Sequence, residues 1–146
     1  MATVKGCNLP DDLLYDVDNH IWFKELGDGT VRVGMTAVAT AMAGKLVAFT
    51  PKGVGKEVKA GKSCATVESG KWVGPAKVAA AGSVVAINDN LVATPNIANS
   101  DPYGEGWLII LKPEDWDSVK GTLVAGSQVA GPYEAKMTAD GFAGCA

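Results

Sequence analysis

The chain has 146 residues, of which 47% are hydrophobic and 20% are charged, a composition typical of a folded globular protein. Its formal net charge of −3 lacks the basic surplus of most nucleic-acid-binding proteins, so we expect no nucleic-acid partner. The most apolar stretch, residues 78–87, is too short to span a bilayer, so we expect no membrane span. The first 12 residues lack the pattern of a signal peptide, which predicts a cytoplasmic protein whose three cysteines are reduced.

The predicted elements are short and mostly β. In chain order we expect strands at 30–33, 46–49, 63–67, 83–87 and 107–111, with a short edge segment at 57–61. We expect short helices at 37–43, at 91–94, after Pro113 and at 133–137 near the end of the chain. Gly44 follows the first of these helices and is a typical C-cap residue. The pattern predicts a mainly β fold with a few short helices.

Few residues are candidates for catalysis or metal binding. His20 is the only histidine, and beside Trp22 we expect it to be a structural hydrogen-bonding residue. Cys7, Cys64 and Cys145 lack the Cys-x-x-Cys spacing of zinc sites, so we expect no metal. Cys64 lies in a predicted strand and is expected to be a small buried hydrophobe. Cys7 and Cys145 are either unconnected thiols on flexible ends or a terminal clasp or redox-active pair, because domain termini are often close in space.

The segment Glu68-Ser69-Gly70-Lys71-Trp72 places a flexible amine at a turn between two predicted strands. A lysine at such a turn is usually only a solvated surface residue. It can also be a covalent tether, because an amide bond to a carboxylated cofactor removes the charge and extends a long arm into solvent. The residues alone leave both interpretations open.

Several motifs occur together in one order. They are His20-Ile21-Trp22, Gly27-Asp28-Gly29-Thr30-Val31, Val33-Gly34-Met35-Thr36, Gly55-Lys56-Glu57-Val58-Lys59-Ala60-Gly61, Val67-Glu68-Ser69-x-Lys71 and Asp101-Pro102-Tyr103-Gly104-Glu105-Gly106-Trp107-Leu108-Ile109. In these motifs the sequence resembles the lipoyl-carrier family of the glycine cleavage H protein, over roughly residues 15–120.

The resemblance implies a fold, a cofactor and a site. The fold is a flattened β-barrel or sandwich, the lipoyl-domain barrel-sandwich hybrid, in a single domain of residues 1–146 with its core at about 15–120 and a tail at 121–146. The cofactor is lipoate, joined by an amide to Lys71 by a lipoate ligase or octanoyl transferase. Glu68 and Ser69 help to present the lysine, and Gly70 and Trp72 flank it. Such a protein is a carrier and not an enzyme.

The sequence departs from the family pattern around this site. The family has an acidic residue between the motif His and Trp and another shortly after the modified lysine, whereas this chain has Ile21 and Pro75. Carboxylates suit the cationic aminomethyl group of glycine cleavage, because a buried ammonium needs a charge partner. The altered hairpin is more similar to lipoate-binding proteins of sulfur oxidation, which work with a heterodisulfide-reductase-like complex. Trp72 and Val73 would then form an apolar wall for the dithiolane ring.

The preferred hypothesis is therefore a lipoyl carrier of sulfur-containing intermediates in cytoplasmic sulfur oxidation. The first alternative is an H protein that carries an aminomethyl group between the glycine cleavage enzymes. The second alternative is a non-lipoylated scaffold that has kept the fold.

Overall fold

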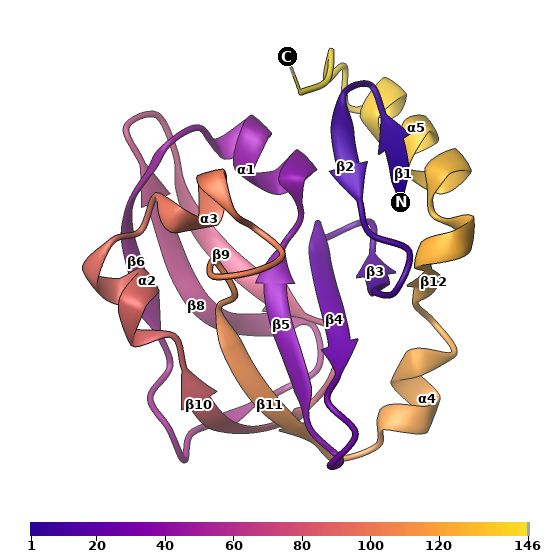
Figure 1. Ribbon diagram of the computed structural model, residues 1–146. Coiled ribbons are helices and arrows are strands. Elements are labelled where there is room, and N and C mark those ends of the chain that lie inside the picture. Colours follow the sequence, from indigo (N-terminus) through magenta and orange to yellow (C-terminus); the bar gives the residue numbers. More distant parts are fainter. Residues whose placement is uncertain (146) are drawn as a thin grey trace.

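The computed structural model describes residues 1–145, which form mostly antiparallel strands (Figure 1). The strands are β1 (Ala2–Val4), β2 (Cys7–Leu9), β3 (Leu14–Asp16), β4 (Ile21–Glu25), β5 (Val31–Met35), β6 (Leu46–Pro51), β7 (Glu57–Val58), β8 (Lys62–Ser69), β9 (Val73–Val78), β10 (Gly82–Ile87), β11 (Ile109–Pro113) and β12 (Val124–Ala125). The helices are α1 (Ala37–Ala43), α2 (Asp89–Ala93), α3 (Ile97–Ser100), α4 (Trp116–Lys120) and α5 (Ala130–Ala139), with a 3₁₀ turn η1 (Gly126–Gln128). None of the described helices is long and apolar enough to cross a membrane.

Two sheets enclose the main core. The larger has the order β12-β3-β4-β5-β11-β10-β7, and the smaller has the order β6-β8-β9. Alternate side chains of β8 point inward, so Val67 is fully buried while its neighbour Glu68 is exposed. The inward residues of both sheets form one apolar cluster, which includes Phe23, Val33 and Leu111. The predicted mainly β barrel-sandwich architecture is confirmed.

A second apolar cluster lies on the outer face of β3 and β4. Ile21 and Phe23 of β4 point into the main core, whereas Trp22 between them is fully buried in the second cluster. Helix α5 covers this cluster with Tyr133 and Met137, one helical turn apart. Because β4 is covered on both faces, its sequence lacks the alternation of polar and apolar residues that predicts a strand.

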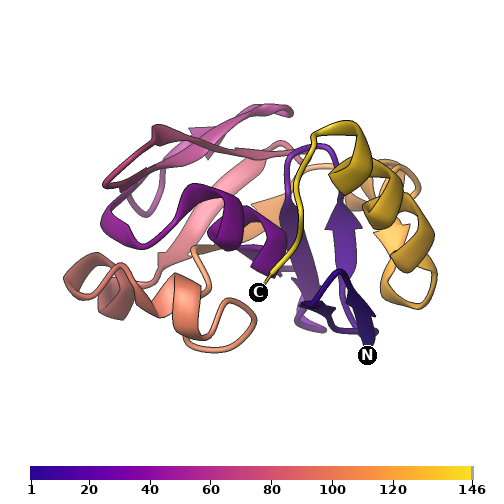
Figure 2. The same cartoon turned by 90° about the horizontal axis from the view of Figure 1, so that it is seen from above.

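Helix α1 has the predicted bounds. The Thr36 hydroxyl accepts a hydrogen bond from the Ala39 amide at its start, and the Gly44 amide donates to the Thr40 carbonyl at its end. Gly44 has a φ of 84°, a conformation that favours glycine. Seen from above, α1 lies between the β6-β8-β9 sheet and the α5 side of the molecule (Figure 2).

Several predicted bounds differ from the structure. The strand expected at 107–111 begins at Ile109, and the C-terminal helix is longer than the expected 133–137. The helix expected at 91–94 begins at Asp89, because Asn88 caps it by accepting from the Leu91 amide. Strands β1 to β4 and β12 and helix α3 were not predicted, and each of them has only two to five residues.

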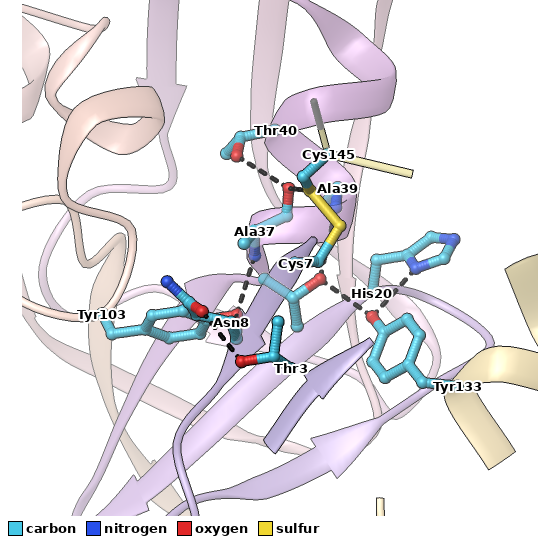
Figure 3. The surroundings of a disulfide bond; sticks show 11 residues. Thr3, Cys7, Asn8, His20, Ala37, Ala39, Thr40, Tyr103, Tyr133 and Cys145 are labelled. Atoms are coloured by element: carbon cyan, nitrogen blue, oxygen red, sulfur yellow. Dashed lines mark hydrogen bonds between the residues drawn. A yellow bond between two sulfur atoms is a disulfide. The ribbon is translucent and has the colours of Figure 1, made fainter. Parts of the chain in front are cut away.

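The expectation that all three cysteines are reduced is wrong for two of them. Cys7 and Cys145 form a disulfide across 138 positions of sequence, which is the clasp alternative (Figure 3). The β1–β2 turn makes this possible, because Gly6 has a φ of 81° and an added Cβ there would overlap the Cys145 carbonyl oxygen. The Cys145 amide donates to the Lys5 carbonyl at 2.9 Å, so the tail is fixed against this turn. Cys64 is free and buried, as predicted.

Candidate functional site

Lys71 lies at the tip of the β8–β9 hairpin, as the sequence predicts. The Ser69 amide donates to the Trp72 carbonyl at 2.7 Å, which closes the turn, and the Ser69 hydroxyl accepts from the Lys71 amide at 3.3 Å. Ser69 is only 5% exposed, whereas Glu68, Gly70 and Lys71 are exposed. Ser69 therefore holds the backbone of the turn, and the Lys71 side chain is left accessible on a rigid base.

A cavity of about 480 Å³ opens beside Lys71. Its lining residues come from β4 and the turn before it, from β5, from α1 and from the hairpin: Asn19, His20, Ile21, Met35, Ala39, Met42, Ala43, Lys71, Trp72, Pro75 and Ala76. Ile21 and Pro75, the two positions at which the sequence departs from the family pattern, thus face the same space. None of the lining residues carries a carboxylate, so the cavity wall offers no charge partner to a cation.

The hairpin side chains contribute unequally to this cavity. Trp72 lines it and is 42% exposed, with its ring packed over Gly74, where an added Cβ would overlap the ring. Val73 does not line it but borders a shallow hollow with Glu68 and Ser69. Of the two residues predicted to form an apolar wall for the dithiolane ring, Trp72 thus lines this cavity and Val73 does not.

The C-terminal end of α1 lies against the Lys71 side chain. A Cβ added to Gly44 would lie 3.1 Å from the Lys71 Cε and 3.8 Å from its Nζ. Ala43 and Met42 of the same helix line the cavity. Helix α1 is therefore the element nearest to the Lys71 amine on this side of the hairpin.

His20, in the turn before β4, also lines the cavity. Its Nδ1 lies 2.9 Å from the Tyr133 hydroxyl oxygen, which in turn lies 2.8 Å from the Thr36 hydroxyl (Figure 3). The two rings are stacked with centroids 5.6 Å apart. Burial, and to a lesser degree the charge of Lys136, lowers the pKa of His20, so the imidazole is neutral at pH 7. The predicted structural role is supported, but the contribution of His20 to the cavity wall was not predicted.

The chemistry available at this site is limited. Lys71 and His20 supply the only titratable side chains among the lining residues. Within residues 1–145, no three His, Cys, Asp or Glu side chains gather as metal ligands would. The site combines an exposed amine, a rigid turn and an apolar cavity, an arrangement that suits a group attached to the amine.

Comparisons with known proteins give a consistent picture. A family model described as "Glycine cleavage H-protein" matches residues 13–136. The "Glycine cleavage system H protein 5" of Aquifex aeolicus is 49% identical over 134 residues, which cover 89% of this chain and 90% of that protein. The "Probable glycine cleavage system H protein 2" of Sulfurisphaera tokodaii is 40% identical over 129 residues, covering 87% and 86%.

A solved structure is also similar. The crystal structure of a glycine cleavage system H protein from Mycobacterium marinum superimposes with a TM-score of 0.75 at 37% sequence identity. The match covers 85% of this chain and 98% of that one.

Proposed function

The chain belongs to the glycine cleavage H-protein family of lipoyl carriers, and we propose that Lys71 is the lysine that holds its lipoate. Proteins of this family carry lipoate covalently on a lysine and are carriers rather than catalysts. The observation that carries the assignment is the exposed Lys71 amine at the rigid β8–β9 turn, beside a cavity lined mostly by apolar side chains.

The residues around Lys71 fit this cofactor. When bound, lipoate supplies a disulfide and dithiol pair at the end of a flexible chain. Ser69 fixes the turn, so the attachment point stays in place while the side chain moves. Exposed Glu68, Gly70 and Trp72 leave the turn open to the lipoate ligase or octanoyl transferase that would modify it. Ile21 and neutral His20 give the cavity an uncharged wall next to the arm.

The names of the relatives support glycine cleavage as the first candidate pathway. Lys71 would then hold the arm that carries an aminomethyl group between the glycine cleavage enzymes. The relatives reported above all carry this name, and each spans more than four fifths of this chain.

The cavity supports a second candidate, a carrier of sulfur-containing intermediates that docks on a heterodisulfide-reductase-like complex. An ammonium group in an apolar cavity needs a carboxylate partner. Ile21 and Pro75 stand where the family pattern has acidic residues, and no residue of the cavity lining carries a carboxylate. A neutral sulfur-bound cargo needs no such partner. Either pathway goes with a cytoplasmic location, in which the Cys7–Cys145 disulfide would be an exception to the usual reduced state.

We propose further that residues 1–146 act as one carrier domain. Its tail of 121–146 contributes Tyr133 and Met137 to the cluster around Trp22. The clasp between Cys7 and Cys145 joins the two ends of the chain.

Peptide mass spectrometry of protein from its own host tests the site. We expect one lipoyl group on Lys71 and none on Lys77, which is an exposed lysine on the same hairpin and serves as the internal control. The variant Lys71→Arg should lose the modification completely. An unmodified Lys71, with a competent ligase and lipoate present, would contradict the proposal and favour the scaffold alternative.

Reconstitution with purified partner enzymes separates the two cargoes. If glycine cleavage is the pathway, the lipoylated protein supports glycine decarboxylation, and Pro75→Asp changes its rate little. If the cargo is sulfur-bound, the wild type is inactive in that assay and binds the heterodisulfide-reductase-like complex. Pro75 is the position to change because it is exposed, whereas a carboxylate at Ile21, which is 1% exposed, would be buried.

A further inference from the structure

Helix α1 lies between Lys71, the proposed attachment site of lipoate, and the Cys7–Cys145 disulfide. Its C-terminal end lies against Lys71, where a Cβ at Gly44 would be 3.8 Å from Nζ. At its N-terminal end the Cys145 Sγ lies 3.7 Å from the Ala37 carbonyl oxygen. Figure 3 shows the Cys7–Cys145 disulfide beside Ala37, Ala39 and Thr40 of this helix. The disulfide and the attachment lysine are therefore at opposite ends of one short helix.

The length of α1 sets the distance between them. Seven helical residues span about 10 Å at 1.5 Å per residue. A lipoyl group has seven bonds between Nζ and its nearer sulfur, which is roughly 9 Å if each bond advances as in an extended chain. Rotation about the bonds of the Lys71 side chain extends this range further. A sulfur atom attached at Lys71 can thus reach Cys145 of the same molecule.

The residues of α1 itself do not obstruct this path. The sequence of α1 contains no charged residue, and its exposed positions are Ala41 and Met42. Ala37 and Ala41 are one turn apart, so small side chains follow each other toward the disulfide. An uncharged arm meets neither a bulky nor a charged group on this face of α1.

The disulfide is open to attack at one of its two sulfurs. Cys7 is only 1% exposed, whereas Cys145 is partly exposed. Both line a surface cavity of about 420 Å³ that also contacts Ala41 and Thr40. Exchange depends on access of the thiolate to a disulfide sulfur, so Cys145 is the sulfur that a dithiol would attack and Cys7 is the leaving group.

We propose that the Cys7–Cys145 disulfide is an internal electron acceptor for the dithiol of the arm on Lys71. In this exchange the Cys7–Cys145 bond breaks and the disulfide of the arm forms. The two protons of the arm thiols pass to Cys7 and Cys145, which are reduced to thiols, while the arm is oxidised. This transfer of electrons from the arm to the disulfide, here called the relay, needs no further oxidant. It rests on the proposed lipoylation of Lys71.

Thiol trapping on the lipoylated protein tests the relay. The arm is reduced anaerobically with NADH and a dihydrolipoamide dehydrogenase, free thiols are alkylated with N-ethylmaleimide at intervals, and labelled cysteines are located by peptide mass. We expect label on Cys7 and Cys145 and consumption of a second equivalent of NADH. The rate constant should be the same at two protein concentrations, because the exchange is intramolecular.

Matched variants separate the relay from direct reduction. Lys71→Arg, which cannot be lipoylated, should leave Cys7 and Cys145 unlabelled. Ala41→Glu places a charge on the path and should lower the rate constant roughly tenfold, since such reactions depend steeply on positioning. Val92→Glu, at an exposed residue of α2, is its control and should have no effect.

The outcomes distinguish the two proposals. A lipoylated Lys71 whose dithiol persists while Cys7 and Cys145 stay oxidised overturns the relay and leaves the carrier function standing. A labelling rate that rises with protein concentration, or equal labelling in Lys71→Arg, also overturns it. A Lys71 without lipoate refutes the carrier function and the relay together.

Discussion

Reduction of the Cys7–Cys145 disulfide should destabilise the fold strongly. The bond closes a loop over 138 positions of sequence, and the chain-entropy relation gives about 5 kcal/mol for a loop of that size. Removing a native disulfide from other small domains costs about 2–5 kcal/mol, so the estimate for Cys7–Cys145 lies at the upper end of that range. An unfolding entropy of about 2.1 cal/mol/K per residue gives about 0.3 kcal/mol/K for 146 residues. We therefore expect the Tm to fall by about 6–16 °C.

Differential scanning calorimetry with and without a phosphine reductant measures this shift. Reduction is a cleaner perturbation than substitution, because a serine at buried Cys7 would add a polar group to the second cluster. The double variant Cys7→Ser, Cys145→Ser is the control, and its Tm should not respond to the reductant. The remaining Cys64 is a free, buried thiol, so the phosphine has no bond to reduce there and Cys64 does not contribute to the Tm shift. A wild-type shift below about 3 °C would refute the entropic reasoning, since the reduced chain would then hold its ends together without the bond.

Three further substitutions test the packing and charges. Gly34→Ala should lower the free energy of unfolding in urea by about 3 kcal/mol, because the new Cβ would lie 2.3 Å from the Trp22 ring. The Trp22 Nε1 donates to two carbonyl oxygens, which hold the ring in place. A loss below about 1 kcal/mol would contradict this packing. His20→Asn should flatten the pH dependence of stability. Burial lowers the pKa of His20 from 6.5 in the folded state, so the stabilisation by neutral His20 is complete above pH 6.5 and is lost as the pH falls toward the folded-state pKa. Equal shifts of the urea midpoint between pH 7.5 and 5.5 in the wild type and the variant would contradict this. Lys120→Ala should cost only about 0.5 kcal/mol, because its ion pair with Glu25 is about half exposed, and a loss above 1.5 kcal/mol would show a larger role.

Local sequence signals predicted the elements that depend on local interactions. Helix α1 has the predicted bounds because Gly44 ends it through backbone geometry alone. The β8–β9 hairpin was predicted because a polar turn interrupts two apolar runs around Lys71. Strand β4 was missed, because both of its faces are covered and Trp22 is buried as fully as Phe23.

The parts of the site that were missed depend on long-range contacts. The sequence indicated that Ile21 and Pro75 differ from the family pattern, but only the fold shows that they line one cavity. The hydrogen bond between His20 and Tyr133 joins residues 113 positions apart, and no local pattern predicts such a pair. The disulfide likewise joins residues 138 positions apart, so no local pattern predicts it. The rule that cytoplasmic cysteines are reduced favoured free thiols instead.

If Lys71 is the attachment lysine, the geometry around α1 gives its arm two places to lie. The turn at Lys71 is closed by the backbone and hydroxyl hydrogen bonds of Ser69, which hold the base of the lysine side chain in place. One side of α1 lines the apolar cavity through Ala39 and Met42, and the other side lines the cavity at the disulfide through Thr40 and Ala41. An arm on Lys71 would therefore have the apolar cavity on one side of α1 and the proposed electron acceptor on the other. Rotation about single bonds of the Lys71 side chain and the arm would suffice to move the arm between the two positions.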